Sequence, residues 1–429
     1  MDIVSIDNMK NSNKKIWLIS GLRTPFAKVD KVLKDKDALQ LSIPVVQEMI
    51  KRDSLCPNLF IWGSVAPNLG YSNLAREILM DAELDQSIPA FTTIMACSTS
   101  MMAAIEAAGL ITEEEVALVG GVESMSRVQL GLNQNFSDWL RRLFQSKTLA
   151  DKLSTLKDLS FGDIRLFIPS VTNRTTGLSM GEHSEITTKR LQIDRERQDE
   201  IALYSHQNYI KARNNGFFDD LILPMDGVKE DKIPRENTSL EQLAKLNPVF
   251  DKESGKGSLT AGNSSLLTDG AAGLWVCGSK AKEKFSDNSY TAQLVDWEIA
   301  AVNIEKEGLL MATTFAIPRL LERHKLRYDE IDLWEIHEAF GAQVLANIKL
   351  LEDKNHLKKV GVSFDFGSFP WENLNPNGGS IAIGHPFGAT GARIINQSIK
   401  ELAQMGPGKK AVVSVCADGG LGTVILLQS

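Results

Sequence analysis

Short apolar segments alternate along the chain with longer segments that carry apolar residues at helical spacing. The short segments are rich in β-branched residues and are typical of buried strands; they lie at 15–21, 58–65, 91–97, 116–125, 331–340, 411–420 and 423–428. The longer segments repeat apolar residues every three or four positions and are typical of helices; they lie at 72–82, 98–111, 199–216, 311–324, 342–353 and 390–405. This alternation predicts an α/β fold.

Two distant stretches resemble each other. FTTIMACSTSMMAA contains Cys97 and AVVSVCADGGLGTV contains Cys416, each at the end of a predicted strand and before small residues. If the two halves of the chain are repeats, these cysteines occupy equivalent strand ends and could meet at one site. Between the halves, residues 128–258 become charged and helical, which indicates an insertion carried by one half. A chain of 429 residues is also longer than one hydrophobic core usually supports.

Composition narrows the class of protein. The formal net charge of -7 argues against a nucleic-acid partner, because such binders usually carry a basic face. The four cysteines lack CxxC spacing, so neither a disulfide framework nor a metal site is expected, and a reducing compartment fits best. The chain contains neither a signal-peptide core nor an apolar run of 18 residues, so we expect a cytoplasmic protein that spans no membrane.

Two residues stand in contexts that favour chemistry. Cys97 lies where a predicted strand passes into an alanine-rich helix, and a helix N-terminus favours a thiolate; an inert buried cysteine is the alternative. His385 lies in the glycine-rich stretch NPNGGSIAIGHPFGATGAR, residues 375–393. Because glycine loses the most backbone entropy on folding, such a cluster marks a place where the backbone closely approaches something else.

Eight segments, all in family order, resemble the thiolase family. They are RTPF at 23–26, ACSTS around Cys97, GGVESMSR at 120–127, DRERQDEIALYSHQ at 194–207, GSLTAGNSSLLTDGAA at 257–272, HEAFGAQ at 337–343, GGSIAIGHPFGATGAR at 378–393 and CADGGLG at 416–422. The resemblance runs nearly from end to end. It implies an α/β thiolase fold of two similar halves stacked in five αβαβα layers, with an inserted loop domain covering a coenzyme A (CoA) site. A CoA thioester would then be what approaches the glycine cluster.

The resemblance also implies a division of the chain. Residues 1–127 would begin the N-terminal half and residues 259–288 would complete it. Residues 128–258 would form the loop domain, and residues 289–429 the C-terminal half.

The family chemistry carries over to matching positions of this sequence. In the degradative direction Cys97 would attack the keto carbonyl of a 3-ketoacyl-CoA while His385 accepts the thiol proton. Cys416 would protonate the acetyl-CoA enolate, and free CoA would then remove the acyl group from Cys97. One oxyanion hole would combine His385 with a water held by His337, and the other the backbone N–H groups of Cys97 and Asp418.

Two of these positions depart from the common family pattern. His337 stands where biosynthetic short-chain thiolases typically have asparagine, and it matches fatty-acid-degrading thiolases that work beside a hydratase/dehydrogenase subunit. Asp418 stands where glycine or alanine is usual, and a carboxylate beside a developing oxyanion is unfavourable unless it points away or pairs with a cation. An inactive acyl-CoA-binding scaffold is therefore an alternative, although the intact Cys97, His385 and Cys416 argue against it.

The resemblance implies CoA and acyl-CoA as substrates and no tightly bound cofactor. For each residue that matches a CoA-contacting position, ordinary packing is the alternative. These residues are Ser265 and Ala261 along the pantetheine, Met180, Ala339 and Phe340 near the thioester, and Arg235 and Phe250 near the adenine.

Residues 136–161 carry apolar side chains at helical spacing, and 135–161 contain five basic and three acidic residues. Such a segment could lie on an anionic membrane, cover a long acyl tunnel, or pack on its own domain or a partner. The segment is similar in length and character to the same region of membrane-associated long-chain thiolases, and that resemblance, together with His337, favours a 3-ketoacyl-CoA thiolase of fatty acid β-oxidation. A short-chain acetyl-CoA acetyltransferase running toward condensation is the alternative. The thiolase resemblance also implies a homodimer or a dimer of dimers, and at His337 it implies a possible hydratase/dehydrogenase partner subunit.

Overall fold

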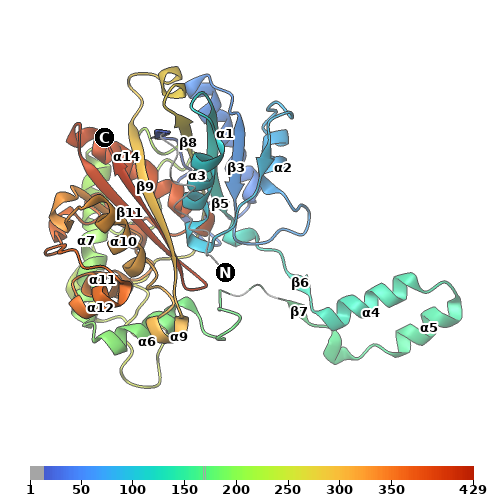
Figure 1. Cartoon of the computed structure of the whole chain (residues 1–429). Helices are drawn as coiled ribbons and strands as arrows, with labels where there is room; N and C mark the ends of the chain where they lie inside the picture. Colours follow the sequence, from blue (N-terminus) through green and yellow to red (C-terminus); the bar gives the residue numbers. More distant parts are fainter. Residues whose placement is uncertain (1–13, 168, 170) are drawn as a thin grey trace, which may run out of the picture.

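A ten-stranded mixed sheet runs through the molecule (Figure 1). The computed structural model describes residues 14–167, 169 and 171–429. In this part of the chain the strand order is β10-β11-β12-β9-β1-β8-β5-β3-β4, and β2 pairs with β8 outside that path. The strands are β1 (Ile16–Ile19), β2 (Ala27–Lys28), β3 (Leu59–Gly63), β4 (Ala90–Phe91), β5 (Val116–Glu123), β8 (Thr268–Gly278), β9 (Thr291–Ala301), β10 (Leu333–Ile336), β11 (Lys410–Ala417) and β12 (Leu421–Gln428).

Helices lie on both outer faces of the sheet and between its two halves, which confirms the predicted five-layered α/β fold. Helices α1 (Ala38–Asp53) and α2 (Leu74–Asp81) pack on the N-terminal strands. In the middle layer α3 (Thr99–Leu110) packs against α14 (Thr390–Met405). On the C-terminal side the layer consists of α10 (Thr313–His324), α11 (Gly341–Leu351) and α12 (Lys354–Val360). The remaining helices are α4 (Gln134–Gln145), α5 (Leu149–Lys157), α6 (Met180–Leu191), α7 (Arg195–Asn214), α8 (Leu240–Ala244), α9 (Ile304–Glu307) and α13 (Ser380–Ile383).

The two halves repeat one strand arrangement. The order β1-β8-β5-β3 runs antiparallel, antiparallel and parallel, and β9-β12-β11-β10 does the same. Helix α3 precedes β5, and α14 precedes β11, so the segment with Cys97 corresponds to the segment with His385. The prediction that Cys97 and Cys416 occupy equivalent strand ends is therefore wrong, because Cys416 lies inside β11, whose counterpart is β5.

The predicted strand over 91–97 is also largely wrong. Strand β4 ends at Phe91, and the chain leaves the sheet to form a 3-10 turn, Ala96–Ser98, before α3. Ala96 has φ 46°, a left-handed value that costs a residue with a side chain about 1–3 kcal/mol. This bend places Cys97 at the entrance of α3 instead of on a strand.

The glycines around His385 lie against protein backbone. A β-carbon on Gly391 would overlap the backbone of Met101 in α3, and one on Gly388 would overlap the Val122 carbonyl oxygen in β5. The expectation that a thioester approaches the glycine cluster is thus wrong at these two positions. The close approach is between the beginning of α14 and the N-terminal half, and it brings His385 to Cys97.

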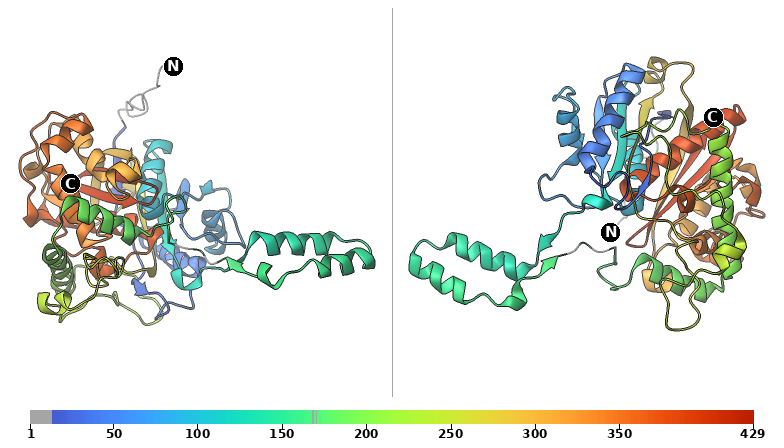
Figure 2. Two further views of the ribbon diagram at one scale, coloured as in Figure 1. Left: turned by 90° about the horizontal axis from the view of Figure 1, so that it is seen from below. Right: turned by 180° about the vertical axis from the view of Figure 1, so that it is seen from behind.

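Helices α4 and α5 form a hairpin that projects away from the rest of the chain (Figures 1 and 2). The two helices hold each other through the indole N–H of Trp139, which donates to the Thr155 carbonyl at 2.7 Å. Strands β6 (Gly131–Leu132) and β7 (Leu166–Phe167) pair at its base. The alternative that this segment packs on its own domain is wrong, whereas α6 and α7, also within residues 128–258, do pack on α11.

In the described part of the chain, no helix combines the length and the apolar character that crossing a bilayer requires.

Candidate active site

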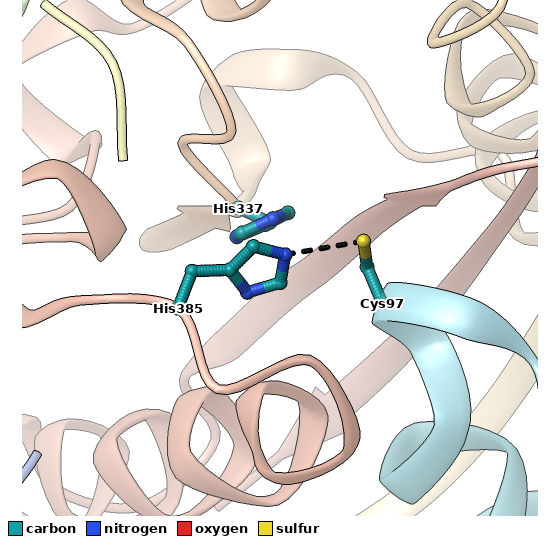
Figure 3. A group of neighbouring side chains, drawn as sticks. All are labelled: Cys97, His337 and His385. Carbon is teal, nitrogen blue, oxygen red and sulfur yellow. Dashed lines mark hydrogen bonds between the residues drawn. The ribbon is translucent and has the colours of Figure 1, made fainter. Parts of the chain in front are cut away.

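Cys97 and His385 form a hydrogen-bonded pair (Figure 3). The distance from Cys97 Sγ to His385 Nε2 is 3.1 Å. On the other side of the ring, His385 Nδ1 lies 2.6 Å from Thr390 Oγ1, whose hydroxyl donates to the Pro386 carbonyl at 3.0 Å. Since the Thr390 hydrogen is used there, Thr390 accepts from His385 Nδ1–H. Nε2 is then the unprotonated nitrogen, and it faces the thiol as an acceptor.

The pair is neutral at rest. Although Cys97 keeps part of its surface exposed, desolvation of the thiol, and next the charge of Asp418, raise the Cys97 pKa to about 12. Burial, and then the nearby Arg393 guanidinium, lower the His385 pKa to about 3. Both shifts disfavour a thiolate–imidazolium pair. The thiol therefore keeps its proton at rest, and His385 Nε2 faces it as a possible acceptor for that proton.

Cys416 faces the same site from β11. The Ser98 hydroxyl donates to the Val415 carbonyl at 3.1 Å, so the residues next to the two cysteines are joined directly. Cys416 is 1% exposed; burial, and then the nearness of Cys97, raise its pKa well above the ordinary value. The structure thus brings Cys97, His385 and Cys416 together, and Cys416 carries its proton at neutral pH.

Two backbone N–H groups point toward the Cys97 sulfur, those of Cys97 and Asp418, and both oppose the rise in its pKa. The Asp418 carboxylate itself is held to one side. Its Oδ1 accepts from Asn173 Nδ2 at 2.8 Å and from the Gly419 N–H at 2.6 Å. An asparagine amide, and not a cation, pairs with this carboxylate, so its negative charge remains near Cys97.

His337 completes the polar group. Its ring centroid lies 4.2 Å from that of His385, and its Nδ1 lies 2.8 Å from Ser380 Oγ. Burial, followed by the unfavourable interaction of a protonated ring with His385 and with Arg393, lowers the His337 pKa well below its usual range, so the ring is neutral. One ring nitrogen from each histidine and the Cys97 sulfur lie within 4.8 Å of one another, a ligand set that a soft divalent metal could also use.

A cavity of about 440 Å³ opens onto Cys97. It lies within the size range of about 300–1,000 Å³ that is typical of ligand pockets. Most of its lining is apolar, and it extends from the thiol toward the base of the α4–α5 hairpin. The described residues that line it include Val65, Pro67, Ala96, Cys97, Met125, Val128, Leu130, Pro169, Val171, Met180, Phe387 and Asp418.

Several of the residues assigned to CoA lie around this site. Met180 lines the cavity and packs with Ala339 and Phe340 in an apolar cluster that includes Cys416. Phe250 joins them, its ring 5.7 Å from that of Phe340 in an edge-to-face contact. Ser265 donates its backbone N–H to the Ala339 carbonyl at 3.0 Å.

Two other assigned residues lie apart from that cluster. Ala261 is exposed. Arg235 is also exposed, and its backbone N–H donates to His206 Nδ1 at 3.3 Å. Among the described residues that line the cavity at Cys97, neither is present.

Sequence reasoning missed four residues that contact the candidate catalytic residues or the side chains that hold them. Thr390, Ser380 and Arg393 lie within the segment 378–393, but only His385 was singled out there. Their hydroxyl and guanidinium groups, within eight positions of His385 along the chain, were the available signal. Asn173 gave no such signal, because its partner Asp418 lies 245 positions away.

Comparison with known proteins agrees with this geometry. The thiolase N-terminal domain family matches residues 16–280, and the thiolase C-terminal domain family matches residues 288–429. A 3-ketoacyl-CoA thiolase from Vibrio cholerae serotype O1 is 34% identical over 97% of this chain and 98% of its own length.

Solved structures give the same result. An acetyl-CoA acetyltransferase from Bacillus anthracis has a TM-score of 0.76 and 30% identity, covering 97% of this chain and 99% of that chain. A thiolase from Ascaris suum in complex with coenzyme A has a TM-score of 0.77 at 26% identity, covering 97% of this chain and 100% of that chain.

These matches extend over both halves of the fold and show that the protein is an acyltransferase. The chain belongs to the thiolase family, as its sequence motifs predicted.

Proposed function

We propose that the protein is a 3-ketoacyl-CoA thiolase that cleaves its substrate with CoA through an acyl-Cys97 intermediate. The observation that carries this proposal is the 3.1 Å contact between Cys97 Sγ and the unprotonated Nε2 of His385. In the first step the Cys97 sulfur attacks the 3-keto carbon while His385 takes the thiol proton. The bond between the α and β carbons then breaks, leaving an acyl group on Cys97 and the enolate of acetyl-CoA.

Cys416 is the proton donor for that enolate. Its buried, protonated thiol lies beside Cys97, so the carbanion forms next to an acid. Protonated His385 then returns to the Cys416 thiolate the proton that it took from Cys97. Free CoA attacks the acyl-Cys97 thioester while His385 takes the CoA thiol proton, and His385 passes this proton to the departing Cys97 sulfur. The N–H groups of Cys97 and Asp418 point toward the Cys97 sulfur, where that thioester forms, and this supports their role as one oxyanion hole.

Mass spectrometry tests the covalent step. Incubation with acetyl-CoA should add one acetyl group, and peptide mapping should place it on Cys97. Cys97→Ser should abolish the adduct, whereas Cys277→Ser, a matched change at a buried cysteine in β8, should retain it. Absence of an adduct in the unaltered protein under turnover conditions would favour the inactive scaffold.

We further propose that the acyl chain occupies the apolar cavity that runs from Cys97 past Val128 and Leu130. This volume favours long 3-ketoacyl chains over the four-carbon substrate of a short-chain enzyme. Val128→Phe should reduce kcat/KM for long chains and spare 3-ketobutyryl-CoA. Leu132→Phe, an exposed position next to this region, is the control. A preference of the unaltered protein for the four-carbon substrate would instead establish the short-chain acetyltransferase.

For CoA itself, we propose a path over Ser265, Met180, Phe340 and Phe250. Support comes from their contacts around Ala339 and from the Ascaris suum thiolase, whose structure contains coenzyme A. The exposed Arg235 is proposed to reach the adenine end. Arg235→Ala should raise the KM for CoA and leave kcat for the acylation of Cys97 unchanged.

The α4–α5 hairpin is proposed as a membrane-contacting surface. It exposes Phe144 by 83% and Leu149 by 74%, and basic side chains outnumber acidic ones on this segment. Insertion of such apolar groups beside cations favours anionic lipid. Flotation with anionic vesicles should recover the protein, and the double change Phe144→Ser, Leu149→Ser should abolish recovery. Leu110→Ser, at an exposed leucine of α3, should not. Vesicle-independent binding to a hydratase/dehydrogenase subunit would instead identify a protein-docking surface.

The remaining features of the proposal are cellular. We place the protein in the cytoplasm, in fatty acid β-oxidation, as a homodimer or a dimer of dimers. Sedimentation velocity measures the assembly directly.

A further inference from the structure

The second histidine of the site, His337, has one ring nitrogen engaged by protein and one left over. Nδ1 lies 2.8 Å from Ser380 Oγ, whereas Nε2 is buried and has no hydrogen-bond partner among the described residues. An unpartnered polar atom in a buried position is costly unless a ligand satisfies it. Nε2 is therefore the atom of His337 that is available to a bound substrate or to its water.

The identity of the proton on His337 follows from what surrounds Ser380. Arg393 Nη2 lies 2.7 Å from Ser380 Oγ, and a guanidinium can only donate. Ser380 accepts that bond and retains one hydrogen of its own. Within the described chain, the only acceptor recorded for this hydrogen is His337 Nδ1. Ser380 therefore donates to Nδ1, and the imidazole proton sits on Nε2.

We propose that Ser380, held by Arg393, is a positioning residue that fixes His337 in the Nε2–H form, so that His337 always presents a hydrogen-bond donor to the substrate oxygen or to its water. The two histidines then have opposite tautomers. Thr390 accepts from Nδ1 of His385 and makes its Nε2 a base, while Ser380 donates to Nδ1 of His337 and makes its Nε2 a donor.

The charge of Arg393 supports the assignment of different tautomers to the two histidines. Arg393 is fully buried beside both rings; burial lowers its pKa only to about 10, so it remains a cation at neutral pH. Burial first, and then interaction with His385 and with the Arg393 cation, keeps His337 neutral, and a neutral imidazole has a single N–H. Without Ser380, nothing in this arrangement would decide which nitrogen carries it.

Nitrogen-15 NMR of histidine-labelled protein tests the assignment without reference to activity. We expect a protonated Nε2 and an unprotonated Nδ1 for His337, identified by loss of its signals in His337→Asn. His385 should show the reverse. A protonated Nδ1 on His337 in the resting protein would overturn the inference. This inference rests on the proposed function, and the spectrum distinguishes failure of the tautomer assignment from failure of the function. If the protein shows the expected tautomer but forms no acyl-Cys97, the proposed function is refuted and the tautomer assignment stands.

A double-mutant cycle measures the consequence for the reaction. Ser380→Ala should lower kcat by about ten- to a hundredfold, less than the roughly hundred- to thousandfold cost of losing an oxyanion donor outright, with a smaller change in KM. In a His337→Asn background the same change should have less than about a threefold effect, because an amide has no tautomer to select. Ser398→Ala, which removes a buried hydroxyl elsewhere in α14, is the control for stability. Equal losses from Ser380→Ala in both backgrounds would show a purely structural role and would overturn the proposal.

Discussion

The hydroxyl of Thr390 offers the most direct test of how the resting site is poised. Thr390→Val keeps the shape of the side chain and removes the acceptor 2.6 Å from His385 Nδ1. The Pro386 carbonyl is not orphaned, because the backbone N–H groups of residues 389 and 390 still donate to it, each at 3.0 Å. The perturbation therefore falls on the His385 tautomer alone.

The size of the effect follows from the cost of an unpaired buried N–H, about 1–3 kcal/mol. His385 can avoid this cost by moving its proton to Nε2, which then cannot accept the Cys97 proton. At 1.36 kcal/mol per tenfold, the base-competent form falls by about five- to 150-fold. We expect a matching loss in the rate of Cys97 acylation by acetyl-CoA, measured in a single turnover, with a smaller change in substrate affinity.

Two variants make this prediction refutable. Thr390→Ser retains the hydroxyl and should acylate at nearly the normal rate. Thr24→Val removes a buried hydroxyl that accepts from the Ala271 N–H at 3.1 Å, so it should lower stability and leave acylation intact. If Thr390→Val acylates at the normal rate, Thr390 does not set the tautomer, and His385 is not poised as we describe.

Three further predictions concern charge, pH and packing. Asp418→Asn removes a charge that raises the Cys97 pKa, so the pH midpoint of Cys97 alkylation by iodoacetamide should fall; an unchanged midpoint would mean that this charge is screened. Burial lowers the His206 pKa to about 4, so below about pH 6.5 the unfolded chain binds more protons than the folded chain. The free energy of unfolding, measured with urea, should therefore fall by about 2 kcal/mol between pH 6.5 and 5 on account of this residue. His206→Gln should make the free energy of unfolding depend less on pH in this range. Gly388→Ala should lower the free energy of unfolding by about 1–3 kcal/mol, because its β-carbon would overlap the Val122 carbonyl. Gly109→Ala in α3, where a β-carbon meets open space, should raise it by about 0.5–1 kcal/mol. Thermal or urea unfolding measures both changes.

The sequence by itself determined the fold class and the family. Alternating strand and helix periodicities are local properties, so they predicted an α/β protein without knowledge of any contact. Motifs such as those around Cys97 and His385 identified the family, which the comparisons confirm. The roles of these residues and the division into domains remain predictions.

Periodicity alone failed where the chain turns sharply. Residues 91–97 are as apolar as a strand, yet Ala96 adopts a left-handed conformation and redirects Cys97 to α3. The strain is tolerated because the surrounding contacts hold it. The pattern of residues 136–161 likewise did not distinguish between a membrane-contacting segment, a cover over an acyl tunnel and a packed helix pair. Only the structure shows that the α4–α5 hairpin projects away from the rest of the chain.

Only the tertiary structure decided how the reactive groups are oriented. The partner of Asp418 is Asn173, 245 positions away, and Gly388 and Gly391 are required by the close approach of β5 and α3. The protons on His337 and His385 depend on which hydroxyl lies within 3 Å of each ring. A hydrogen bond depends on the distance and direction between two atoms in space. The packing of distant segments sets both, and the positions of these segments along the chain do not reveal them.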